Sequence, residues 1–345
     1  MKLGITGLKG SGKNTLFEAF TGLSHDSSAY KGEDRIGTVK VPDERVDFLS
    51  NMYQPKKTTY AQVQFFLPFT KSLSGNQNKD ENVWSQIRNC DAIINVVRNF
   101  KAYGEKDPEP LKDFESLDQE FILSDLIIVE KRLERIAQDR QRGKKNIPEE
   151  ISLLNQCQKY LNDNIPLRTD KSLQEAQLLK GFAFLSLKPV LILFNNEDDD
   201  MELPSINEAI KKENFMVIRG KLEQELAQMP EEDINEFLLE FDISESAMNR
   251  IIKASYDMSG LISFFTVGDD EVKAWTIKNN TNAQDAAGTI HTDFKKGFIR
   301  AEVLAYKDLL EAQTYNEARK KGSVRLEGKT YIVNDGDIIN FRFNV

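Results

Sequence analysis

The sequence predicts an α/β fold: a doubly wound sheet that begins with a phosphate-binding loop, an inserted helical hairpin, and a small C-terminal α+β domain. Three observations predict it. A short apolar segment at residues 1–5 leads directly into a glycine-rich loop and then a helical run. Two short, almost continuously apolar runs follow at 92–97 and 190–194, with helical patterns between them. From about residue 260 onward, short strand-like segments alternate with turn residues. Alternating strands and helices after such a loop are typical of doubly wound domains.

The composition limits the class of protein. The chain has 345 residues, enough for two or three domains. Its 46 basic and 55 acidic residues give a net charge of −9, which argues against sequence-specific DNA binding and against a generally basic nucleic-acid binder. The two cysteines, Cys90 and Cys157, lie far apart, which fits a reducing cytoplasm better than a disulfide scaffold. No stretch approaches the roughly 20 apolar residues of a membrane span, so no membrane partner is expected.

The first candidate site is the glycine-rich segment at residues 7–15, the phosphate loop. Its glycines let backbone N–H groups turn inward around a phosphate, and the following helix adds partial positive charge. Lys13 can reach the terminal phosphates of a nucleotide. Asn14 stands where a hydroxyl group normally coordinates Mg²⁺, so its amide oxygen is the candidate metal ligand of this loop. The nucleotide-binding candidates in the loop are Gly7, Lys9, Gly10, Ser11, Gly12, Lys13, Asn14 and Thr15.

Further strands are expected in the same domain. Residues 36–41 and 60–67 are rich in β-branched and aromatic residues, which favours strands. The apolar runs at 92–97 and 190–194 suit strands that are buried on both faces of a parallel sheet. Because both runs are short and flanked by polar residues, strand is favoured over helix.

Between the two apolar runs, the pattern predicts a helical hairpin. Residues 121–141 and 148–161 carry apolar residues at helical spacing, and a third helix is expected at 172–181. The link at 140–145 is basic and contains a glycine. It could contact a phosphate backbone. The alternative is a solvated loop tip, which exposed runs of charge commonly form.

The C-terminal part has its own pattern of strands and turns. Short strands are expected at 264–267, 272–277, 331–333 and 338–343, with a turn at 334–337. Basic residues between 295 and 325 could form a face for RNA. The same region carries many acidic residues, so scattered solvated charge is the alternative.

Several of these segments resemble one known family. The C-terminal segments 264–277, 286–302 and 325–345 closely resemble the TGS-containing tail of the YchF family, the Obg-like ATPases. The phosphate loop and residues 87–98 and 188–195 are also similar to that family, so the resemblance covers nearly the whole chain.

The resemblance implies a three-part organisation. It implies a P-loop nucleotide-binding domain at 1–125 and 182–260, an inserted coiled-coil hairpin at 126–181, and a TGS-like domain at 261–345. It also implies hydrolysis of ATP or GTP in the cytoplasm, and association with ribosomes or RNA in translation or stress.

Three departures from the family pattern surround the metal position. Asn14 replaces the hydroxyl residue, residues 29–36 contain no switch threonine and place Lys31 nearby, and Leu67 stands roughly where the family has an aspartate. Phosphoryl transfer depends mostly on positioning and on charge neutralisation by the metal. The losses therefore indicate weakened or lost hydrolysis and argue against a bound Mg²⁺. The alternative function is a non-hydrolysing pseudo-GTPase that acts as a protein or RNA interaction module.

The base-recognition segment is better preserved. Asn195 and Asp198 match the family's N-x-x-E, with Asp198 as in the N-x-x-D of guanine binders. The next element of the family pattern is a small pair of residues, and here it is replaced by Arg219, Gly220 and Lys221. The family's glutamate goes with adenine, so ATP and GTP both stay open. The alternative for Asp198 is one member of a solvated acidic loop.

Overall fold

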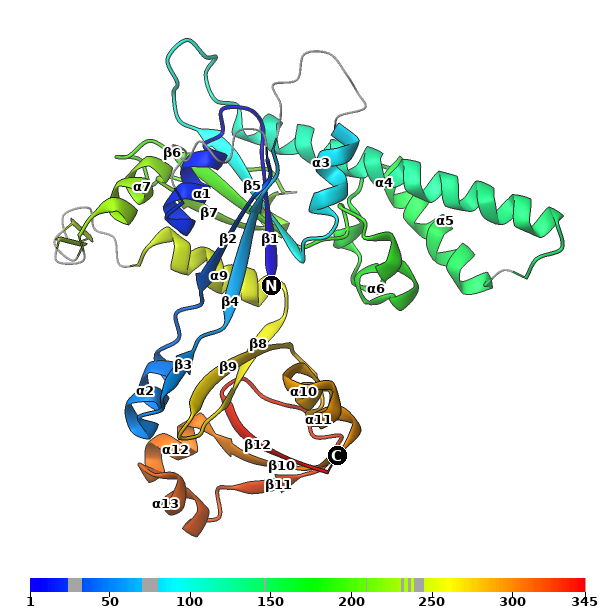
Figure 1. The fold of residues 1–345 in the computed structure, drawn as a ribbon. Helices are drawn as coiled ribbons and strands as arrows, with labels where there is room; N and C mark the ends of the chain where they lie inside the picture. The colour runs from blue at the N-terminus through cyan, green and yellow to red at the C-terminus, as the bar shows by residue number, and fades with distance from the viewer. Residues whose placement is uncertain are drawn as a thin grey trace. The chain divides into compact units, whose positions relative to one another are not determined.

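The computed structural model describes residues 1–23, 33–69, 80–145, 147–208, 210–230, 233–234, 237–238 and 245–344 (Figure 1). The chain forms two compact units. The first unit contains Met1–Val39 and Gln64–Arg250, and the second contains Lys40–Val63 and Ile251–Val345. No helix in these described ranges has both the length and the apolar character needed to cross a membrane.

The first unit is built on a six-stranded sheet with the order β2-β4-β1-β5-β6-β7. The pairs β4–β1, β1–β5, β5–β6 and β6–β7 are all parallel. Every residue of β6 is buried, as its continuous apolar pattern predicts. The strands are β1 (Lys2–Thr6), β2 (Arg35–Lys40), β4 (Gln62–Leu67), β5 (Ala92–Asn99), β6 (Val190–Asn196) and β7 (Asn214–Ile218). The predicted α/β class and its two apolar strands are confirmed.

One hydrophobic core joins the strands of this sheet to α4. Ile93, Val97 and Phe194 of the strands meet Phe114 and Phe121 of α4. Near the other end of the unit, α1 packs against α7. The helices are α1 (Lys13–Thr21), α3 (Asp80–Ile87), α4 (Pro110–Gln141), α5 (Pro148–Asn162), α6 (Lys171–Glu175) and α7 (Gly220–Gln228), with short 3₁₀ segments η3 (Leu167–Thr169), η4 (Gln177–Phe182) and η5 (Ile210–Lys212). Helix α9 (Ala247–Met258) begins in the first unit, and its residues from Ile251 onward belong to the second.

The predicted hairpin is present as α4 and α5, which lie side by side and extend away from the strands (Figure 1). Val129, Leu154 and Cys157 are fully buried between the two helices and the segment that follows them. The first helix begins at Pro110, eleven residues before its predicted start at 121. The third predicted helix, at 172–181, was wrong as a single element: α6 ends where Ala176 takes an extended backbone, and η4 follows.

Asp125 anchors the base of the hairpin to the sheet side of the unit. Its carboxylate is fully buried and accepts a hydrogen bond from Arg88 Nη1 at 2.6 Å. It also accepts from the backbone N–H of Leu185 at 3.0 Å, and from the N–H and hydroxyl of Ser186 at 2.7 and 2.8 Å. Four donors on one buried carboxylate compensate the loss of its hydration. Asp125 therefore fixes α4 to the segment that leads into β6.

The second unit is built on a second six-stranded sheet, with the order β11-β10-β12-β8-β9-β3. Its strands are β3 (Lys57–Thr59), β8 (Leu261–Thr266), β9 (Glu271–Lys278), β10 (Phe298–Ala305), β11 (Arg325–Glu327) and β12 (Asp337–Phe343). Its helices are α2 (Glu44–Tyr53), α10 (Ala283–Ile290), α11 (Thr292–Lys296), α12 (Tyr306–Ala312) and α13 (Tyr315–Lys320).

The strand predicted at 331–333 was wrong. Ile332 forms only an isolated bridge with Asn282. The reason is local, because this segment lies along the start of α10: Ala283 N–H donates to Tyr331 O at 2.8 Å and Val333 N–H donates to Thr281 O at 3.0 Å. The turn predicted at 334–337 is present, with Gly336 at φ 86°.

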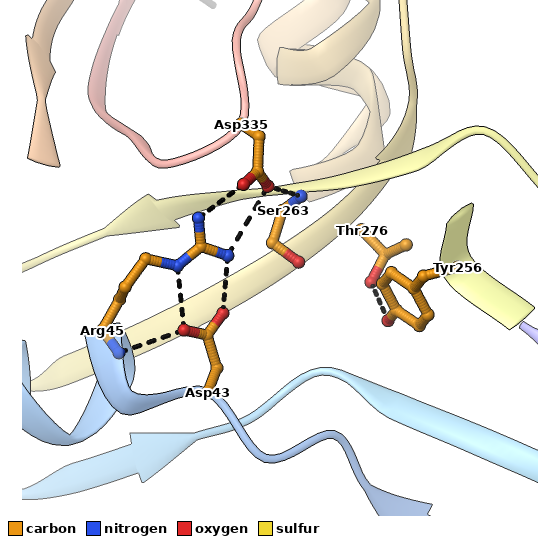
Figure 2. Close-up of polar contacts among 6 residues, drawn as sticks. All are labelled: Asp43, Arg45, Tyr256, Ser263, Thr276 and Asp335. Carbon is orange, nitrogen blue, oxygen red and sulfur yellow. Dashed lines mark hydrogen bonds and ion pairs between the residues drawn. The ribbon is translucent and has the colours of Figure 1, made fainter. Parts of the chain in front are cut away.

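Residues 40–63 belong to the second unit, which differs from the predicted boundary that gives all of 1–125 to the nucleotide-binding domain. Strand β3 pairs with β9. The side chain of Arg45, at the start of α2, lies between two carboxylates (Figure 2). It donates from Nε to Asp43 at 2.9 Å and from Nη1 to Asp335 at 2.6 Å, and Asp335 also accepts from the N–H of Ser263 at 2.9 Å. These contacts tie α2 to the turn before β12.

Candidate nucleotide-binding site

The phosphate loop connects the end of β1 to the start of α1. Gly7, Gly10 and Gly12 have φ angles of 143°, 80° and 94°, a region that side chains rarely adopt. Space is also restricted: a Cβ on Gly7 would lie 2.3 Å from Val96 O, and a Cβ on Gly12 would lie 2.3 Å from Asn195 Nδ2. The loop therefore folds back closely on the neighbouring strands, and glycine is required at both positions.

Two groups in the loop have unmet hydrogen-bonding capacity. Gly12 is the N-cap residue of α1 and no side chain caps this helix, so its first amide groups are open to an anion. Ser11 is 1% exposed, and its Oγ has no hydrogen-bond partner in the described part of the chain. An unpaired buried hydroxyl costs about 1–3 kcal/mol. Both observations fit a phosphate group in this loop.

Lys13 lies folded against the loop. Its Nζ donates to Gly7 O at 2.7 Å and to Leu8 O at 2.6 Å. Burial lowers the pKa of this ammonium group from 10.5 to about 8. In this structure the loop carbonyls accept the hydrogen bonds of the ammonium group. A phosphate oxygen could accept them instead.

Asn195 joins three loops of the site. It lies near the end of β6, is 4% exposed, and donates from Nδ2 to Ser11 O at 3.0 Å. Its Oδ1 accepts from the N–H of Gly220 at 2.9 Å, at the start of α7. A Cβ on Gly220 would lie 2.7 Å from that oxygen. The structure thus brings the predicted residues Asn195 and Gly220 together with the phosphate loop, at the edge where parallel strands end.

The remaining predicted residues lie at the outside of the site. Asp198 and Lys221 face each other, with Asp198 Oδ2 3.7 Å from Lys221 Nζ and side chains that are 38% and 71% exposed. Such an exposed pair contributes little stability, so both groups stay available to a ligand. Lys9 and Asn14 are exposed, and Thr15 is half-buried.

Of the three positions near the metal where the sequence differs from the family pattern, the structure describes two, Asn14 and Leu67. The amide of Asn14 is exposed, whereas Leu67, the last residue of β4, is 4% exposed and has no ligating atom in its side chain. Lys31 lies outside the described residues, as do 70–79. Within the described ranges, no group of three His, Cys, Asp or Glu side chains could hold a metal ion.

Sequence reasoning missed one residue that borders the loop. Phe100 directly follows β5, and its Cε1 lies 4.0 Å from the position that a Cβ on Gly12 would take. Its ring therefore forms part of the wall beside the N-terminus of α1. The sequence feature that could have indicated Phe100 is its position, as an aromatic residue at the carboxyl end of a buried parallel strand, where such sheets bind ligands.

The lowered pKa of Lys13 gives a pH prediction. In the free protein this ammonium group loses its proton above about pH 8, and a bound phosphate stabilises the charged form and raises its pKa. Binding above pH 8 therefore requires proton uptake, and affinity for a nucleoside diphosphate should fall by up to about tenfold per pH unit above that value. Calorimetric titration between pH 7.5 and 9.5 measures this. Lys13→Arg, which stays protonated, should bind with a flat profile; a flat wild-type profile would contradict the assignment.

Comparison with known proteins gives full-length matches. The family model YchF-GTPase_C, described as a protein of unknown function (DUF933), matches residues 261–344. The ribosome-binding ATPase YchF of Bacillus subtilis (strain 168) is 38% identical over 361 residues, which cover 99% of each chain. The protein of the same name from Haemophilus influenzae is 35% identical over 362 residues, covering 100% of this chain and 99% of the other.

Solved structures agree with the sequence matches. The Schizosaccharomyces pombe YchF GTPase superposes with a TM-score of 0.85 at 30% identity, covering 99% of this chain and 97% of the other. A GTP-binding protein from Pyrococcus horikoshii OT3, 18% identical with a TM-score of 0.64, shares the fold.

Proposed function

Because this chain belongs to the YchF family, we propose that it binds a purine nucleotide, ATP or GTP, in the phosphate loop, and that it acts in the cytoplasm in association with ribosomes. Relatives of matching length are named ribosome-binding ATPases, which supports both parts of the proposal. The nucleotide is a proposed ligand, and the residues of the loop other than the exposed Lys9 are its proposed contacts.

One observation carries the nucleotide assignment: a partly buried ammonium group inside a loop of left-handed glycines. Lys13 Nζ lies 2.6 to 2.7 Å from two loop carbonyls, beside the uncapped N-terminus of α1. A terminal phosphate would accept from Lys13 in place of these carbonyls and would also accept from the helix amides. The unpaired hydroxyl of Ser11 is consistent with an acceptor in this loop.

The base would meet the outer edge of the site. Asp198 can accept two hydrogen bonds from guanine N1 and N2, while Lys221 can donate to guanine O6; adenine presents only one donor and one acceptor at that edge. The ring of Phe100 would pack against the base. This chemistry favours guanine, whereas the relatives' name supports adenine, so the test below includes both.

We further propose that hydrolysis is weakened or lost. The residues present do not fit a Mg²⁺ ion in its usual place: an exposed amide replaces the hydroxyl, and a buried leucine side chain stands near the aspartate position. Without the metal, the largest source of charge neutralisation in phosphoryl transfer is missing. A non-hydrolysing pseudo-GTPase that acts as an interaction module is the second candidate, and Leu67 is the residue that favours it.

Calorimetry and a turnover assay test these proposals together. ADP, ATP, GDP and GTP are titrated in EDTA and again in Mg²⁺, and turnover is compared with that of Lys13→Ala. We expect at least one purine nucleotide to bind with similar affinity in both buffers, and turnover close to that of the variant. Strict dependence on Mg²⁺, or turnover well above the variant, would contradict weakened hydrolysis. No binding of any of the four would contradict the nucleotide assignment.

A further inference from the structure

The free end of the helical hairpin carries an unusual concentration of positive charge. The hairpin tip, residues 135–145, holds five cations and one carboxylate, a net charge of +4 in a chain whose total is −9. The cations are Arg135, Arg140, Arg142, Lys144 and Lys145, and all five residues are exposed. The nucleotide site accounts for none of them.

Pairing within the tip uses very little of this charge. The carboxylate of Asp139 is engaged by Lys144, whose Nζ lies 2.8 Å from Oδ1. In the described part of the chain, no ion pair or side-chain hydrogen bond involves Arg135, Arg140, Arg142 or Lys145. Compensation of the helix dipole at the end of α4 explains one cation in the last turn, Arg140, and is worth about 0.3–1 kcal/mol. Among the other three cations, Arg142 attracts the Asp139 carboxylate electrostatically without forming an ion pair with it.

The tip is also held in a defined shape. Gly143 takes a left-handed conformation with φ 76°, and its N–H donates to Arg140 O at 3.0 Å. Lys144 N–H donates to Asp139 O at 3.0 Å. A few residues below the tip, Arg132 binds Glu150 through two hydrogen bonds of 2.8 and 3.0 Å, which join α4 to α5. A pre-organised set of cations loses less entropy on binding than a flexible tail does.

The chemistry of the tip selects the class of partner. Protein interfaces are centred on buried apolar or aromatic anchors. Residues 137–145 contain one apolar side chain, that of Ala137; the larger apolar neighbours are Ile136, which is buried at 5% exposure, and Ile147, which is 52% exposed. Binding to a nucleic-acid backbone needs no apolar anchor, because arginine and lysine contact phosphates directly. Arginine, which can bind phosphate through two parallel hydrogen bonds, supplies three of the five cations.

We infer that the hairpin tip is an RNA-binding surface that contacts the phosphate backbone through Arg140, Arg142 and Lys145. This inference rests on the proposed association with ribosomes, and it assigns that association to one end of one helical hairpin. The recognition is electrostatic and independent of base sequence.

The test removes three charges from the tip in the full-length protein. Arg140→Gln, Arg142→Gln and Lys145→Gln are combined in one variant. The matched control combines Lys112→Gln, Lys171→Gln and Lys211→Gln, three lysines of the same unit whose side chains are 70%, 87% and 54% exposed. The probes are a fluorescein-labelled RNA hairpin with an A-form stem and purified Bacillus subtilis ribosomes, between 50 and 200 mM salt.

We expect the tip variant to bind both probes at least about tenfold more weakly at 50 mM salt. The slope of log affinity against log salt should fall by about 2 to 3, since each phosphate contact contributes about 0.7–0.9. The control should stay within about twofold of wild type. Equal binding by the tip variant and wild type, or equal losses in both variants, would overturn the inference. Loss of ribosome binding without any wild-type binding to RNA would also overturn it, in favour of an acidic protein partner.

The same experiment separates this inference from the proposed function. If wild type does not bind ribosomes, the proposed association itself fails. If wild type binds ribosomes and the tip variant binds them equally, only the tip assignment fails. Nucleotide titration of the tip variant should match wild type, because the tip contributes no residue to the phosphate loop.

Discussion

Replacing Lys13 with alanine is expected to lower nucleotide affinity by about 100-fold while the protein stays folded. Its Nζ is the one ammonium group that lies within hydrogen-bond distance of the phosphate-loop carbonyls in the described structure. Hydrogen bonds to charged groups contribute about 1.5–3 kcal/mol, and about 2.7 kcal/mol corresponds to a 100-fold change. Stability should not fall, because the wild-type protein holds a largely desolvated ammonium group whose pKa is lowered to about 8. Calorimetric titration and a thermal melt measure the two quantities.

The loop provides its own matched control. Lys9 lies four residues earlier in the same loop, carries the same charge and is exposed. Lys9→Ala should change affinity by no more than about threefold, as expected for an exposed charge. Retained affinity in Lys13→Ala would remove Lys13 from the site. Equal losses in both variants would mean that the loop attracts phosphate by overall charge, without the contact assigned to Lys13.

Replacing Asp125 with alanine is expected to destabilise the first unit by about 3–5 kcal/mol, the usual cost of removing one partner of a buried charge pair. The substitution leaves Arg88, whose side chain is 13% exposed, without its carboxylate. It also leaves the N–H groups of Leu185 and Ser186 without their acceptor. Urea unfolding measures the effect. Trp84, which packs edge-on against Phe121 of α4 with ring centroids 5.1 Å apart, is the fluorescent reporter.

The chain has two tryptophans, and Trp275 belongs to the second unit. All variants therefore carry Trp275→Phe, so that the fluorescence reports only on Trp84 in the first unit. Glu130→Ala is the control, because Glu130 is an exposed carboxylate on the same helix. It should change the free energy of unfolding by less than about 0.5 kcal/mol. A loss below about 1 kcal/mol in Asp125→Ala would show that Asp125 does not anchor the hairpin.

Local sequence patterns were sufficient for most of the fold. The continuous apolar run of β6 and the glycine spacing of the phosphate loop each have a direct physical cause, burial on both faces and left-handed backbone. Two predictions were incomplete or wrong. In residues 110–120 the apolar residues Leu111, Phe114 and Leu117 recur every three residues, a helical spacing that the predicted start at 121 overlooked, and Phe114 and Leu117 are buried against the sheet. Residues 331–333 have strand character, but their backbone groups bond to the start of α10.

The candidate site was predicted in part. Asn195 lies near the end of β6 and Gly220 follows β7, so the parallel sheet places both at one edge, where Asn195 bonds to Gly220 and to Ser11. The contacts of Asp125 and Arg45 could not be predicted, because they link positions 60 and 290 residues apart in the chain. Nothing in the local pattern of residues 57–59 indicates that they pair with β9.

The inclusion of residues 40–63 in the second unit has a consequence for how the chain folds as it is synthesised. About 190 residues separate this segment from the rest of its unit. At about 5–20 residues per second, α2 leaves the translating ribosome roughly 10–40 s before β8 and β9 exist. During that interval Val46 and Leu49, both fully buried in the finished protein, have no core to enter. The nascent chain therefore carries these two apolar side chains without their core until its last hundred residues emerge.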